Sequence, residues 1–149
     1  MKVKKIVLDD KAVYLRLSSS KLAEYASSIG SDGNTLFAVM DALDVLQNQA
    51  ALFEAALNYK GNPNEIHDGF ELIDMLADAE YGPLGVKQLV VELAQDAGII
   101  SNVDAAKLVA AIKTGNEKLY EATVAVLSCD AASLPGAQKE PEEVEENPT

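Results

Sequence analysis

Residues 70–100 constrain the fold of this chain more than any other segment. The run FELIDMLADAEYGPLGVKQLVVELAQDAGII predicts a helix, a break at Tyr81-Gly82-Pro83, a second helix and a stop at Gly98. The run contains no histidine, cysteine, serine or threonine, so nothing in it resembles a nucleophile or a metal site. A segment of this kind indicates packing and partner binding rather than catalysis.

The first 17 residues predict a β-hairpin. Residues 3–8 and 12–17 are rich in β-branched and apolar side chains, and residues 9–11 separate them as a turn. In the second run apolar and polar residues alternate with the two-residue period of a half-buried strand. Because an isolated hairpin is marginally stable in water, we expect this one to pack on helices or to join another sheet.

From Ser18 onward the apolar spacing is helical. Serines, asparagines and glycines mark the starts and stops, and Asn62-Pro63-Asn64-Glu65 is a particularly strong start signal. The longest predicted helix runs from Asn34 or Thr35 to about Tyr59. The pattern as a whole predicts helices over residues 18–29, 34–59, 62–81, 84–97, 102–114 and from 116 through 127.

We therefore expect a mainly α fold, with five to six helices in one compact domain. The domain is expected to cover residues 1–134, of which 1–17 form the hairpin and 18–134 are helical. Residues 135–149, PGAQKEPEEVEENPT, contain three prolines, five glutamates and almost no apolar side chain. This composition cannot offset the entropy of ordering, so it predicts a disordered acidic tail.

Charge and cysteine content exclude several classes of protein. The net charge is −12, and an acidic surface repels phosphate, which disfavours direct binding to nucleic acid. Cys129 is the sole cysteine, so no intrachain disulfide is expected and a reduced cytoplasmic setting fits best. No apolar run approaches the roughly 18 residues that a membrane span requires.

Motifs that carry chemistry are also missing. His67 is the sole histidine, and the chain contains neither the GxGxxG nor the GxxxxGK spacing of nucleotide-binding loops. Acidic residues recur at helical steps and predict a solvated helix face rather than paired catalytic carboxylates: Glu65, Asp68, Glu71, Asp74 and Asp78. We expect no catalytic residues, no metal site, no cofactor and no enzymatic activity. A cleft gathering His67, Cys129 and a carboxylate would be needed to reopen that question.

The predicted long helix carries two apolar stripes. The broader stripe has core-type spacing, and the thinner one lies on nearly the opposite side: Phe37, Val45, Leu52 and Tyr59. One interpretation is a central helix buried on two sides. The other is that these four residues form a half-exposed surface that binds a partner or a second copy of the chain, so a homo-oligomer is an open alternative.

Four segments resemble the tail assembly chaperones of long-tailed bacteriophages, particularly those of phages and prophages of Gram-positive bacteria. They are VKKIVLDDKAVYLRLSSSKLAEYASSIG, TLFAVMDALDVLQNQAALFEAALN, ELIDMLADAEYG and VKQLVVELAQDAGII. Together they cover roughly residues 3–100. The resemblance lies in the order and local character of the elements.

The resemblance implies a non-enzymatic role in the host bacterial cytoplasm. Such chaperones bind the tape measure protein while the tail tube assembles around it, and they are absent from the mature virion. In many relatives a ribosomal frameshift makes a longer product whose added domain contacts the tail tube protein, and this chain would be the shorter product. The alternative is a small acidic helical adaptor or regulatory protein, unrelated to phage, that binds one folded partner.

Overall fold

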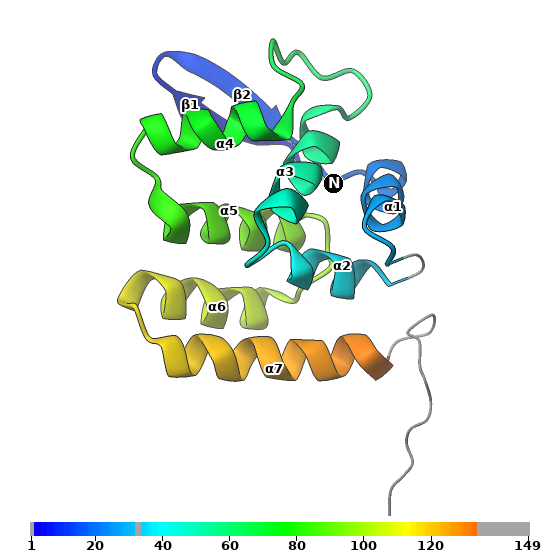
Figure 1. The fold of residues 1–149 in the computed structure, drawn as a ribbon, viewed down its shortest axis with the longest axis vertical. Helices are drawn as coiled ribbons and strands as arrows, with labels where there is room; N and C mark the ends of the chain where they lie inside the picture. The colour runs from blue at the N-terminus through cyan, green and yellow to red at the C-terminus, as the bar shows by residue number, and fades with distance from the viewer. Residues whose placement is uncertain (1, 32–33, 134–149) are drawn as a thin grey trace, which may run out of the picture.

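The computed structural model describes residues 2–31 and 34–133, and it confirms the predicted fold class: mainly helical, with an N-terminal antiparallel hairpin. The elements are β1 (Lys4–Leu8), β2 (Lys11–Leu15), α1 (Ser19–Ser28), α2 (Thr35–Asp41), α3 (Leu46–Leu57), α4 (Gly69–Asp78), α5 (Gly82–Asp96), α6 (Asn102–Thr114) and α7 (Glu117–Ser133). Figure 1 shows α4, α5, α6 and α7 stacked in that order, with the hairpin at the α4 end. The predicted acidic tail, residues 135–149, lies outside the described residues.

The hairpin has the shortest common loop. Leu8 pairs with Lys11, so the loop is Asp9-Asp10, one residue shorter than the predicted turn. Both aspartates have positive φ, 48° and 70°, which matches the twist that two-residue hairpin loops require. The residues that alternate along the inner face are buried, as the two-residue period predicts: Ile6, Leu8, Val13 and Leu15.

Several helix ends lie where the capping signals predict them. The Ser18 hydroxyl accepts a hydrogen bond from the backbone N–H of Lys21 at the start of α1. Asn116 caps α7 in the same way, because its side-chain oxygen accepts from the N–H of Leu119 at 3.0 Å. Gly115, between α6 and α7, has a φ of 68°, the left-handed conformation that ends helices.

The single long helix predicted over residues 34–59 is wrong. The chain forms two helices, α2 and α3, with Val45 in an extended conformation between them. The Gln49 side chain donates to the backbone oxygen of Leu43 at 3.0 Å and holds the corner. The corner lets α2 pack on α1 and α7 while α3 packs on α1, α4 and β2. One straight helix could not reach both sets of neighbours, and the split accounts for the seventh helix of the described residues.

The helix predicted to start at Asn62 is also wrong in its first turns, because residues 62–68 are not helical and α4 begins after Asp68. The reason is Asn64, whose side chain is buried. Its Nδ2 donates to the backbone oxygens of Tyr14 at 2.7 Å and Leu57 at 2.8 Å, and its Oδ1 accepts from the N–H of Tyr14 at 2.8 Å. The amide thus satisfies the outer edge of β2, as a further strand would.

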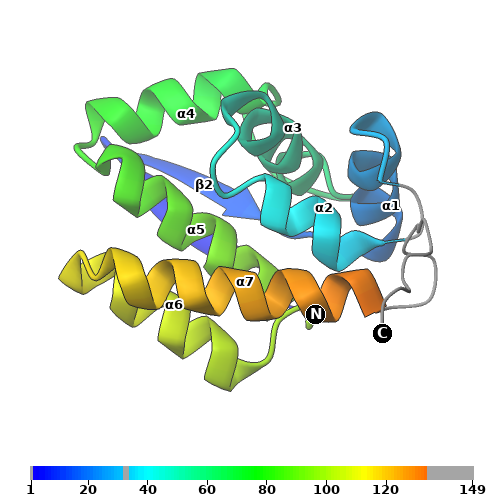
Figure 2. The same ribbon diagram turned by 60° about the horizontal axis from the view of Figure 1, so that its bottom comes forward.

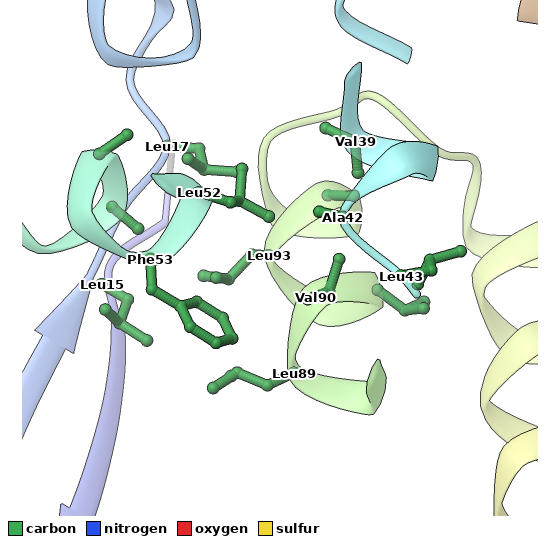
Figure 3. Close-up of a cluster of buried hydrophobic side chains, with 14 of the residues drawn as sticks. Leu15, Leu17, Val39, Ala42, Leu43, Leu52, Phe53, Leu89, Val90 and Leu93 are labelled. Carbon is green, nitrogen blue, oxygen red and sulfur yellow. The ribbon is translucent and has the colours of Figure 1, made fainter. Parts of the chain in front are cut away.

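Helix α5 lies at the centre of the apolar core. Figure 3 shows Leu89, Val90 and Leu93 of α5 facing residues of the hairpin, of α3 and of the α2–α3 corner. Leu52 and Phe53 of α3 are fully buried in this cluster. Figure 2 shows α7 running beside α6 and past α2, so the last helix closes the core from the side opposite α4.

We expect Asp41→Asn to stabilise the protein at pH 7 by about 0.5 kcal/mol. Partial burial raises the pKa of the Asp41 carboxyl, so the folded state disfavours its charge. Asp41 is also the last residue of α2, where the helix dipole repels a negative charge. The Asp41 carboxyl has its ordinary pKa in the unfolded state and a raised pKa in the folded state. Its contribution to stability is therefore lost as the pH rises from the ordinary pKa through the raised one.

The stabilisation by Asp41→Asn should therefore shrink as the pH falls towards the ordinary aspartate pKa of about 4. Thermal melts of both proteins across the pH range measure it. Asp74→Asn, at an exposed position of α4, is the matched control and should change the melting temperature less. A gain in melting temperature that is equal at all pH values would show that Asp41 does not have a raised pKa in the folded state.

Candidate functional site

The four residues predicted to bind a partner do not form one surface. Phe37 on α2 is 46% exposed and Val45, in the α2–α3 corner, is 43% exposed. Leu52 is fully buried in the core, and Tyr59 is 7% exposed. The continuous stripe that the sequence pattern suggested is absent because the helix that would carry it is broken at Val45. Of the four, Phe37 and Val45 are available to a partner in this conformation.

The residues considered for catalysis lie on the surface. His67 is in the loop before α4, where its Nδ1 lies 2.7 Å from the side-chain oxygen of Asn58. Cys129 is exposed on α7. The predicted acidic row is exposed throughout, but only Glu71, Asp74 and Asp78 lie on a helix face, because Glu65 and Asp68 precede α4. Within residues 2–31 and 34–133, no group of three or more His, Cys, Asp and Glu side chains is placed to hold a metal ion.

A hollow of about 430 Å³ lies where the α2–α3 corner meets α4 and the start of α5. Most of its lining is apolar: Leu43, Leu46, Ile73, Ala77, Pro83 and Val86. Leu46 is 51% exposed although its neighbour in the lining, Leu43, is buried. We call this the apolar hollow. It leaves a large aliphatic side chain in contact with solvent beside a surface that an apolar group can cover.

A second hollow of about 340 Å³ adjoins the first, and the two share Asp44 and Lys87. Its other lining residues come from the start of α5, the end of α6 and the start of α7: Leu84, Ala111, Ile112, Gly115, Asn116, Glu117, Tyr120 and Glu121. Three carboxylates and one ammonium line it, so we call it the acidic hollow. Together the two hollows form the Lys87 groove.

Lys87 stands at the junction of the two hollows. Its Nζ lies 2.8 Å from the Oδ1 of Asp44 and 4.7 Å from the centroid of the Tyr120 ring. Burial lowers the pKa of Lys87. The hydrogen bond and charge of Asp44, together with the interaction with Tyr120, outweigh the effect of burial, so the pKa of Lys87 is raised overall. Lys87 therefore stays charged at neutral pH and fixes the α2–α3 corner to α5.

Tyr120 forms one wall of the acidic hollow. Its hydroxyl is buried, and within the described part of the chain it meets no partner in good hydrogen-bond geometry. Burial raises the pKa of Tyr120 and the charge of Asp44 raises it further, while Lys87 acts in the opposite direction. The ring is thus held as a neutral aromatic surface against the Lys87 ammonium.

Sequence reasoning missed the Lys87 groove, because its central residues come from three distant parts of the chain: Asp44, Lys87 and Tyr120. One local signal existed. Lys87 is the sole basic residue of α5 and directly follows Val86, a core position of that helix. The stem of such a lysine covers apolar surface while its ammonium faces water or a carboxylate, and a carboxylate partner cannot be read from the spacing.

The groove combines exposed apolar side chains with fixed charges, and this chemistry suits the binding of another polypeptide. No helix in the described part of the chain is long and apolar enough to cross a membrane. Comparisons with protein-family models, with curated proteins and with solved structures gave no match.

Proposed function

We propose that this chain is a tail assembly chaperone of a long-tailed bacteriophage, which binds the tape measure protein in the host cytoplasm while the tail tube assembles. The resemblance of residues 3–100 to that family supports the identity of the client. A longer frameshifted product would contact the tail tube protein. In this proposal the chain transforms no substrate and is absent from the mature virion.

The Lys87 groove is the observation that best supports polypeptide binding. A chaperone for an aggregation-prone client needs accessible apolar surface, and Leu46 and Leu84 at the groove are each 51% exposed. It also needs to remain soluble while that surface is free. The net charge of −12 serves this purpose, because like-charged molecules repel one another.

Co-expression with a tape measure protein from the genome that encodes this chain tests the proposal. We expect the client to move from the insoluble to the soluble fraction and to copurify with this chain. The measurement is the soluble share of the client with and without the chain, at equal expression. An unrelated protein of similar size and charge is the control. A client that stays as insoluble as before would refute the proposal and favour the adaptor alternative.

A further inference from the structure

The apolar hollow can accept one or two aliphatic side chains. Its wall is built from Ile73 and Ala77 of α4, Pro83 and Val86 of α5, and Leu46 at the start of α3. Its volume of about 430 Å³ exceeds that of a single leucine side chain. An incoming apolar group would cover Leu46, which is otherwise half exposed.

The acidic hollow selects for a basic group. Asp44, Glu117 and Glu121 line it against the single ammonium of Lys87, so its formal charge is −2. Lys87 already shows how an ammonium fits there, between a carboxylate and the face of Tyr120. Both glutamates are exposed and without an ion pair among the described residues, so they can pair with a partner's lysine or arginine.

The elements around the groove favour a helical partner. The walls are helices, helix ends and the α2–α3 corner, and both strands of the sheet lie outside the groove. No strand of the described residues lines the groove, so an extended peptide would find no sheet edge there to extend. A helix instead presents apolar and basic side chains along one face, three and four residues apart.

We propose that the Lys87 groove binds an amphipathic helix of another polypeptide. Apolar side chains of that helix enter the apolar hollow, and a basic side chain one or two turns away pairs with Glu117 and Glu121. This inference rests on the proposed function in that the helix belongs to the client. The inference specifies the chemistry of the client segment, an amphipathic helix with basic side chains, and the surface that binds it, the Lys87 groove.

Two designed 18-residue helical peptides with the same leucine face test the inference. One carries lysines along the rim of that face and the other carries glutamates. Fluorescence anisotropy with the full chain should show at least about tenfold tighter binding of the lysine peptide, an advantage that falls with added salt. Equal binding of the two peptides would overturn the inference.

Variants locate the binding. Leu46→Ala should weaken binding of the lysine peptide about fivefold to tenfold, whereas Val103→Ala, an exposed apolar residue in the first turn of α6, should not. Replacing Glu117 and Glu121 together by glutamine should weaken it about fivefold. The matched control replaces Asp9 and Asp10 by asparagine, which removes the same charge at the hairpin. Equal losses of affinity in the two double variants would show that the lysine peptide is attracted by the overall negative charge of the chain, and would overturn the inference.

The client assay separates this inference from the proposed function. If the wild-type chain keeps the tape measure protein soluble and the groove variants do so equally well, the groove assignment is wrong and the chaperone proposal stands. If the peptides discriminate as expected but the client stays insoluble with the wild-type chain, the chaperone proposal is wrong and the groove assignment stands. Thermal melts establish that each variant is folded.

Discussion

Replacing Gly69 by alanine is expected to destabilise the protein by about 3 kcal/mol or to displace α4 from α3. Gly69 is the first residue of α4 and is buried against α3. A Cβ at this position would lie 1.8 Å from the backbone oxygen of Ala50 and 2.6 Å from its carbonyl carbon. Backbone atoms of a packed helix cannot move aside as the end of a flexible side chain can, so the two helices must separate.

Denaturant unfolding followed by circular dichroism measures this loss. Gly85→Ala is the matched control, because Gly85 lies within α5 and the atoms nearest its added Cβ would belong to the Tyr81 side chain, at 3.1 Å or more. The better helix propensity of alanine offsets that contact, so we expect a change smaller than about 1 kcal/mol. An unfolding midpoint for Gly69→Ala that matches the wild type would show that α4 does not approach α3 this closely.

Asn64→Ala is expected to cost about 3 kcal/mol, because three backbone groups lose their partner at once. The N–H and oxygen of Tyr14 and the oxygen of Leu57 all bond to the Asn64 side chain, which is 8% exposed. Water cannot readily replace it there. Hydrogen exchange should also speed up at the amide of Tyr14, which the Asn64 side chain protects.

Asn58→Ala provides the comparison. The Asn58 side chain also makes three hydrogen bonds, to the backbone oxygens of Glu54 and His67 and to the His67 ring, but it is on the surface. Water can take its place, so the expected loss is less than about 1 kcal/mol. Similar losses of stability for the two alanine variants would mean that the Asn64 side chain does not satisfy buried backbone groups at the edge of β2.

The predictions that held were those with local causes. The hairpin follows from the alternation of residues 12–17. Ser18 and Asn116 mark the starts of α1 and α7, and Gly115 marks the end of α6. Each of these signals acts within four residues of the position that it marks. A capping side chain or a left-handed glycine works largely independently of the rest of the fold.

The predictions that failed depended on contacts between distant residues. Nothing in Ala42-Leu43-Asp44 forbids a helix, yet the chain turns there because burial of Leu43 and the pairing of Asp44 with Lys87 outweigh helix propensity. Asn62-Pro63-Asn64-Glu65 is a good helix start in isolation. The bonds of Asn64 to Tyr14, 50 residues away, outweigh that preference.

The four residues predicted to bind a partner are separated from one another for the same reason. Phe37, Val45, Leu52 and Tyr59 share a face only if one helix carries them all, and the corner at Val45 places Leu52 in the core. The Lys87 groove is built around Asp44, Lys87 and Tyr120. No periodicity links positions so far apart, because each periodic pattern describes one element and the groove lies between several.

By itself the sequence determined that the described chain is mainly helical, opens with a hairpin and bounds several of its helices at particular serines, asparagines and glycines, since those preferences arise within a turn or two of backbone. Tertiary structure alone decided where the longest apolar segment bends, which asparagine closes the edge of β2 and where apolar and acidic side chains meet at the surface. Those outcomes depend on burial and on pairs of charges or hydrogen-bonding groups that only the packed chain brings within reach.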